Sequence, residues 1–345
     1  MILKDSFDDF LRNRVNLNKT RLERVRSAHR SVRDVLSADE DIAPDFVGTF
    51  LQGSYAYKTA TRSPHEDDPY DVDVVLALDL EHDWGNLPSG YSVLSDVYDA
   101  LDAVPLYAGK VELRERCVRV AYSSDGMSFH LDVLPADAPD GTQGILHIPR
   151  DWCETHPRGY GEWLNEINAA RCGELKRVVK LLKYWRTLHG LSVNSMVLTT
   201  LAAECLPDDA LSVDDALVLT LEGIAGWAGD QSNWLVPTVE NPSLDGEDLA
   251  RAWPLWDWQK FRSAVSGAAE AARAARDSAD EEETIEEWNG EALYDGLFPT
   301  TVRGLGAEAR ATATAFSSGT LYAAVLGSQS RPAVRANRGY FGRSR

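Results

Sequence analysis

The sequence predicts a protein of the α/β (α+β) class, in which a half that combines helices with a small mixed sheet is followed by a helical half. Two observations carry this prediction. Between residues 47 and 135, short apolar runs bounded by turn residues are typical of strands. From residue 175 onward, apolar residues recur with the helical period and no strand pattern returns. We therefore expect one domain at 1–160, a helical domain at 161–327 and a basic, disordered tail at 328–345.

The first half begins with a pattern of apolar residues among many charges that predicts one long amphipathic helix over 5–37, ending before Pro44. An apolar strand at 47–51 then leads into Gly53 and Ser54, which read as a turn opening a short helical piece. The other elements expected in this half are a strand at 71–78, a helix at 93–103, and strands at 111–121 and 128–135 that form a hairpin through the turn at 124–126. The segment 151–168 reads as a loop followed by a helix.

The second half is a series of amphipathic or Ala-rich segments. Helices are expected at 175–190, 195–205, 210–228 and 252–275, with an extended connector around Pro237 and Pro242, and the stretch 281–297 carries acids and Trp288.

Composition excludes several classes of protein. With 44% hydrophobic residues and ten tryptophans the chain can form a substantial core. No apolar run approaches the length of a membrane span and the N-terminus is acidic and polar, so we expect neither a membrane protein nor a signal peptide, and a cytoplasmic location. The four cysteines form no C-x-x-C pair, which favours reduced thiols over a disulfide framework or a zinc site.

The net charge is −19, from 35 basic and 54 acidic residues. This balance argues against a groove for long nucleic acid, which needs a basic surface, but it does not exclude nucleotides. The C-terminal stretch 331–345 runs the other way, with five arginines and no acid.

Three aspartates are the strongest chemical signal. Asp71 and Asp73 alternate with Val72 and Val74, so both carboxylates lie on one face of a strand that continues as a buried apolar run. Asp132 lies inside a second apolar strand, where a lone carboxylate is costly unless it is paired or bound to a metal. The alternative is a solvated strand edge. Taken together, the three acids favour a shared site for divalent cations.

Phosphate contacts are predicted from smaller signals. Gly53 allows close backbone approach, and Ser54 adds a hydroxyl at a helix start, although an ordinary N-cap serine would look the same. Lys176, Lys180 and Lys183 form one basic stripe, which is either a solvated face or a source of one lysine, Lys183 by preference, that reaches a triphosphate. Ser195, at the start of the next helix, is a similar candidate.

Other catalytic arrangements are missing from the sequence. It holds no G-x-x-x-x-G-K-[ST] loop, no G-x-G-x-x-G after a strand and no H-E-x-x-H. We place His130 on the strand face opposite Asp132 and assign it a structural role.

Several motifs together resemble a known family. Gln52-Gly53-Ser54, followed by Asp71-Val72-Asp73 and the strand-borne Asp132, resembles the polymerase β-like nucleotidyltransferases. The segments around it narrow the resemblance to the bacterial cGAS/DncV-like nucleotidyltransferases of CBASS anti-phage defence: TFLQGSYAYKTATR, the 151–164 piece, LLKYWR at 181–186 and VENPSLDGEDLARAW at 239–253.

The resemblance implies a two-lobed enzyme with a nucleotidyltransferase core, a C-terminal helical lobe and the N-terminal helix as a spine between them. It implies an enzyme that joins nucleoside triphosphates into a cyclic di- or trinucleotide second messenger. Asp71, Asp73 and Asp132 would bind two Mg²⁺ ions, with Mn²⁺ as a possible substitute. Gln52, Gly53, Ser54, Lys183 and Ser195 would contact the nucleotide, and an operon-encoded helper could act on the C-terminal tail, which otherwise reads as a solvated end.

Two other functions remain open at this point. One is a nucleotidyltransferase that modifies a non-nucleotide acceptor, such as a drug, a tRNA end or a protein. The other is a catalytically inactive nucleotide-binding scaffold of the same fold.

Overall fold

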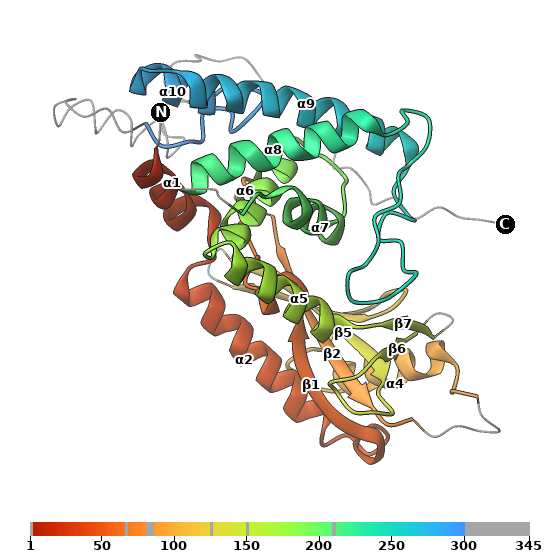
Figure 1. Ribbon diagram of the computed structural model, residues 1–345. Helices are drawn as coiled ribbons and strands as arrows, with labels where there is room; N and C mark the ends of the chain where they lie inside the picture. The colour runs from red at the N-terminus through yellow and green to blue at the C-terminus, as the bar shows by residue number, and fades with distance from the viewer. Residues whose placement is uncertain are drawn as a thin grey trace. The chain divides into compact units, whose positions relative to one another are not determined.

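A mixed sheet forms the centre of the first half of the chain (Figure 1). The computed structural model describes residues 3–300 except 66–67, 81–85, 125–126, 150–151 and 209–211. The main strand order is β1-β2-β5-β4-β3, and β6 and β7 extend the sheet from β5. The pair β2 and β5 is parallel and the other described pairs are antiparallel. The strands are β1 (Phe46–Gln52), β2 (Tyr70–Leu78), β3 (Val111–Leu113), β4 (Val118–Ser124), β5 (Met127–Asp137), β6 (Leu146–Ile148) and β7 (Cys153–Thr155).

The strands at 47–51, 71–78 and 128–135 are confirmed, but the single strand expected over 111–121 is wrong. It is two strands, β3 and β4, because the backbone N–H of Arg114 donates to the carbonyl of Cys117 and reverses the chain there. The hairpin of β4 with β5 is confirmed, although residues 125–126 of its turn lie outside the described residues. The short strands β6 and β7 were not predicted, since three residues carry too little pattern.

The single helix expected over 5–37 is interrupted. Helix α1 (Lys4–Phe10) continues as a π-helical segment (Leu11–Val15), and α2 (Lys19–Leu36) then starts anew. Asn16 takes an extended conformation, and the side chain of Asn18 caps α2 by accepting from the backbone N–H of Arg21 at 2.9 Å. An extended residue followed by an N-cap ends one helix and begins another, which charge and apolar periodicity alone did not reveal.

Helices dominate the second half, as predicted. They are α5 (Pro157–Ala170), α6 (Glu174–Leu188), α7 (Ser195–Cys205), α8 (Val213–Asp230), α9 (Leu255–Asp277) and α10 (Glu281–Trp288), while the first half adds α3 (Gly53–Ala56) and α4 (Gly90–Asp102). No helix in the described part of the chain is both long and apolar enough to cross a bilayer. The predicted tail at 328–345 lies outside the described residues.

The chain has separate apolar cores that the N-terminal helices link. Phe7 and Phe10 of α1 are fully buried with the helical half, where the ring of Phe7 meets Trp288 at 4.8 Å. Val25 and Val32 of α2 pack instead with the sheet and α4. Figure 1 shows α2 running along the sheet while α1 lies beside α6 and α8. The N-terminal segment thus joins both halves, and a domain boundary near residue 160 remains a prediction.

Candidate active site

The three predicted acids meet on two adjacent strands. β2 carries Asp71 and Asp73, and β5 carries Asp132, which is the register partner of Asp73 in the parallel pair. Register partners in a sheet point to the same face, so the carboxylates of Asp73 and Asp132 are neighbours. The apolar residues that follow in β2, such as Val74 and Val75, are fully buried and hold the acids at the edge of the core.

Gly53 lies directly against this group of acids. It follows β1, whose last residue Gln52 is the register partner of Asp73, and it begins α3. Its φ of 63° lies in the left-handed region, and a Cβ at this position would collide with Oδ2 of Asp73. Two independent constraints therefore require glycine here.

The acids repel one another electrostatically. The pKa of Asp73 is raised to about 6, first by burial and then by the charges of Asp132 and Asp71, while Lys183 and Arg119 oppose the shift. A buried carboxylate with two like neighbours is stabilised by any cation that enters the site.

All eight residues predicted for the site line one cleft of about 670 Å³. They are Gln52, Gly53, Ser54, Asp71, Asp73, Asp132, Lys183 and Ser195. The sheet supplies the acids, the start of α3 supplies the glycine and serine, and α6 and α7 supply the lysine and second serine.

Lys183 is buried in the cleft wall, with 4% of its surface exposed. Its Nζ donates to Oγ1 of Thr59 at 3.2 Å, and its pKa is lowered to about 7 by burial first and by the charge of Arg186 second. Arg186, one turn further along α6, donates to Oγ of Ser195 at 2.8 Å and also lines the cleft. These two cations face the acids across the cleft and make it suited to a polyphosphate.

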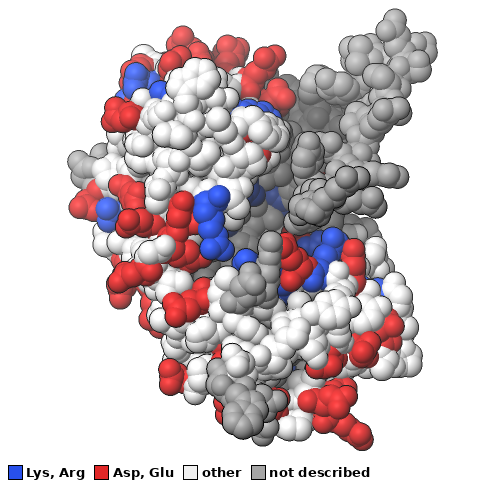
Figure 2. Space-filling view, turned by 90° about the vertical axis from the view of Figure 1, so that its right-hand side faces the viewer, with Lys and Arg blue, Asp and Glu red and all other residues white. Residues whose placement is uncertain are grey.

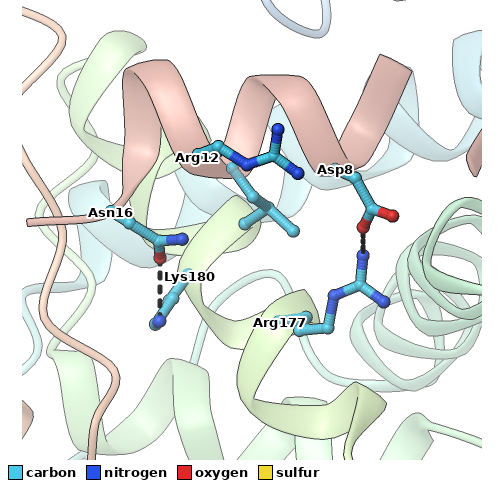
Figure 3. A pocket seen from close by; sticks show the side chains of 6 residues that line it. Asp8, Arg12, Asn16, Arg177 and Lys180 are labelled. Carbon is cyan, nitrogen blue, oxygen red and sulfur yellow. Dashed lines mark hydrogen bonds and ion pairs between the residues drawn. The ribbon is translucent and has the colours of Figure 1, made fainter. Parts of the chain in front are cut away.

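The lysine stripe predicted on α6 divides between two places. Lys180 lies in a separate cavity of about 430 Å³ between α6 and the α1–π segment, where its Nζ donates to Oδ1 of Asn16 at 2.8 Å (Figure 3). Across the same cavity, Asp8 and Arg177 form an ion pair. Lys183 is the member of the stripe that lines the cleft with the acids.

Two residues near the acids were not predicted from the sequence, and a third, His130, was predicted on the wrong strand face. Arg119 of β4 is the register partner of Asp132 and binds it, and Arg186 lines the cleft. The sequence signal for Arg119 was an arginine within an apolar strand. The signal for Arg186 was an arginine three residues after Lys183. The placement of His130 opposite Asp132 was wrong, because residues two apart on a strand share a face. Its Nδ1 lies 3.0 Å from Oδ1 of Asp71.

The acids suit a hard divalent cation in their chemistry. Aspartate oxygens are the ligands that Mg²⁺ prefers, and burial beside Asp132 and Asp71 raises the pKa of Asp73, so a cation in the site would favour its ionised form. In the described ranges, however, no three His, Cys, Asp or Glu side chains are arranged ready to hold a metal. Both oxygens of Asp132 are instead bound by Arg119, each at 2.7 Å.

Charge on the surface is unevenly distributed. Figure 2 shows a face that is hollowed at mid-height, with Lys and Arg side chains in and beside the hollow and Asp and Glu both beside it and spread over the outer surface. Local positive charge on an acidic protein can attract small phosphorylated ligands without favouring a long nucleic acid.

Comparison with known proteins identifies relatives of this fold and sequence. Residues 1–168 match the family model described as the Second Messenger Oligonucleotide or Dinucleotide Synthetase domain. A cyclic AMP-AMP-AMP synthase from an Acinetobacter species is 27% identical over 300 residues, which cover 84% of this chain and 83% of that protein.

Solved structures share the fold. CdnC of E. coli MS115-1, solved with ATP, has a TM-score of 0.67 at 17% identity and covers 87% of this chain and 99% of its own. DncV of Vibrio cholerae, a cyclic AMP-GMP synthase solved with a nonhydrolyzable GTP, has a TM-score of 0.63 at 15% identity and covers 82% of this chain and 94% of its own.

Proposed function

The chain belongs to the cGAS/DncV-like nucleotidyltransferases, and on that premise we propose that it joins nucleoside triphosphates into a cyclic di- or trinucleotide with release of pyrophosphate. The observation that carries the proposal is the single cleft in which three carboxylates face Lys183 and Arg186. Because curated relatives include a cyclic AMP-AMP-AMP synthase, an adenine-containing cyclic product is the first expectation. Its role would be a second messenger in anti-phage defence, made in the cytoplasm.

Each group in the cleft has a role that its position supports. Asp71, Asp73 and Asp132 would hold Mg²⁺, or Mn²⁺ in its place, which would neutralise charge at the α-phosphate and help ionise the attacking ribose hydroxyl. The backbone at Gly53 and the hydroxyl of Ser54 would contact phosphate oxygens. Lys183, Arg186 and Ser195 would bind the triphosphate from the opposite wall, which fixes its orientation for in-line attack.

Thr59 supports this arrangement by holding Lys183. Its hydroxyl and carbonyl oxygens lie 3.2 and 3.5 Å from Nζ. A lysine held by neutral oxygens keeps a donor available for phosphate, whereas a carboxylate partner would neutralise it.

Product analysis tests the proposal directly. The purified protein is incubated with Mg²⁺ or Mn²⁺ and all four ribonucleoside triphosphates, treated with phosphatase and analysed by mass spectrometry. We expect a phosphatase-resistant cyclic mass that disappears in EDTA. Transfer of a nucleotide to a non-nucleotide acceptor, without a cyclic mass, would favour the acceptor-modifying alternative.

Asp73→Asn separates an enzyme from an inactive scaffold. Loss of the carboxylate is expected to lower product formation by about a thousandfold, since charge stabilisation dominates this chemistry, while circular dichroism stays unchanged. Asp79→Asn is the matched control, because Asp79 is exposed just beyond the same strand. Nucleotide binding without any turnover in the unmodified protein would favour the scaffold.

The C-terminal tail enters the proposal only as a handle for a helper protein. The stretch GYFGRSR at the end of the chain lies outside the described residues. Removing it is expected to leave product formation by the isolated enzyme unchanged.

A further inference from the structure

Arg119 holds two of the three acids at once. Its Nε and Nη2 donate to the two oxygens of Asp132, each at 2.7 Å, and Nη2 also lies 3.1 Å from Oδ1 of Asp71. The bidentate geometry is the strongest form of the arginine–carboxylate pair. The guanidinium therefore bridges Asp132 and Asp71 in the structure.

The ion pair between Arg119 and Asp132 is largely buried. About 21% of the Arg119 side chain and 14% of the Asp132 side chain are exposed, so water screens their attraction weakly. β4 and β5 place the two residues as register partners, so the contact is built into the sheet. Asp71 is more open, at 57%, and it is shared with His130.

We propose that Arg119 competes with divalent metal for Asp132 and Asp71. This inference rests on the proposed function, because it takes these acids to be metal ligands. A guanidinium and a divalent cation repel each other when they share two carboxylates. The arginine must release at least one carboxylate as the metal enters, and metal binding is weaker by that cost.

The alternative role for Arg119 predicts a change in metal affinity of the opposite sign. If Arg119 only aligned Asp132 for the metal, its removal would loosen a ligand and weaken metal binding, as happens when residues that support metal ligands are lost. Competition predicts that removal strengthens metal binding. The sign of the change in metal affinity therefore decides between the two roles.

The test measures Mn²⁺ binding to the full-length, nucleotide-free protein by the electron paramagnetic resonance of free Mn²⁺. Arg119→Gln keeps a donor for Asp132 and removes the charge. It is expected to bind Mn²⁺ about tenfold more tightly, the size of effect that residues next to metal ligands commonly have. Arg119→Lys, which keeps the charge but cannot bind both oxygens of Asp132, is expected to lie between Arg119→Gln and the unmodified protein. Equal or weaker binding in both variants would overturn the proposal.

Arg273→Gln is the control, because it removes an arginine–carboxylate pair with Glu222 on helices α8 and α9, whose bond is 2.6 Å long. It should leave Mn²⁺ affinity unchanged. Thermal unfolding gives a second readout: without divalent cation Arg119→Gln is expected to melt lower than the unmodified protein, and Mn²⁺ should raise its melting temperature by more.

The two proposals fail in different ways. If none of the proteins binds Mn²⁺, the inference about Arg119 is overturned, and a cyclic product from the same unmodified preparation would show that the proposed function stands. If Arg119→Gln binds Mn²⁺ more tightly but no preparation makes a cyclic product, the inference stands and the proposed function fails.

Discussion

Lys183 couples nucleotide binding to pH. Because the pKa of its ammonium is lowered to about 7, the free protein loses this charge as pH rises through 7. Bound triphosphate favours the charged form, so binding takes up a proton above that pH. We expect ATP affinity to fall by about tenfold between pH 7 and 9, as one charge-assisted hydrogen bond is lost.

The measurement is ATP titration by calorimetry at several pH values. Lys183→Met is expected to bind weakly with a flat pH profile. Lys180→Met, altered one turn earlier where the side chain binds Asn16 in the other cavity, should keep the sloping profile. A sloping profile in Lys183→Met would contradict the assignment.

Lys183 also makes the free energy of unfolding depend on pH. Between pH 7 and 10.5 the folded protein carries a neutral Lys183 while the unfolded chain is protonated, so the unfolded state binds more protons. The free energy of unfolding therefore gains a contribution that rises with pH across this window. Below pH 7 both states are charged, and the cost of burying the ammonium is present in full.

At Gly53 the close approach of the backbone and the position of the Asp73 carboxylate depend on each other. Gly53→Ala is expected to reduce product formation by at least about a hundredfold, because the new Cβ would collide with the carboxylate of Asp73 and displace it. Gly48→Ala on β1, the strand that precedes Gly53, is the control, since a Cβ there meets nothing within 4 Å. Equal activity of the two variants, measured by product mass spectrometry, would show that the position of Asp73 matters little.

At the scale of elements, the side chain of Asn18 caps the start of α2 after the break that follows α1. Asn18→Ala removes the N-cap of α2 and is expected to lower the free energy of unfolding by about 1 kcal/mol. Urea denaturation measures the change. Asn13→Ala removes an exposed side-chain bond to Asp9 and should change the free energy of unfolding by less than about 0.5 kcal/mol.

The strands and helices that were predicted well share a property. β2 and β5 are apolar runs whose strands lie in the core, and α6 carries one clear apolar stripe. In these elements the sequence pattern and the burial of the side chains in the folded protein agree. The elements that were missed depend on contacts between distant segments. β6 and β7 are three residues each and exist because they pair with one another and with β5.

Sequence patterns predicted which residues form the site better than they predicted the charge interactions among those residues. Spacing on one strand was enough to place Asp71 and Asp73 together, and an isolated acid in an apolar strand drew attention to Asp132. No pattern could show that Arg119 stands opposite Asp132, because that depends on the register of a hairpin whose first strand was itself misjudged. Burial of Lys183 likewise follows from the packing of α6 on residues around Thr59.

At the scale of the whole molecule, the N-terminal helices tie together two cores that unfolding should separate. Phe7 packs in the helical core, whereas Leu36 of α2 packs in the sheet core, and both side chains are fully buried. Truncation to alanine is expected to cost about 3–5 kcal/mol for Phe7 and about 2–5 kcal/mol for Leu36.

Hydrogen exchange followed by mass spectrometry can locate each loss. Phe7→Ala is expected to speed exchange in α6 and α10, which lie in the core that Phe7 helps to fill, and to leave β2 and β5 protected. Leu36→Ala should do the reverse. If either variant speeds exchange equally in both sets of elements, the two cores unfold as one unit.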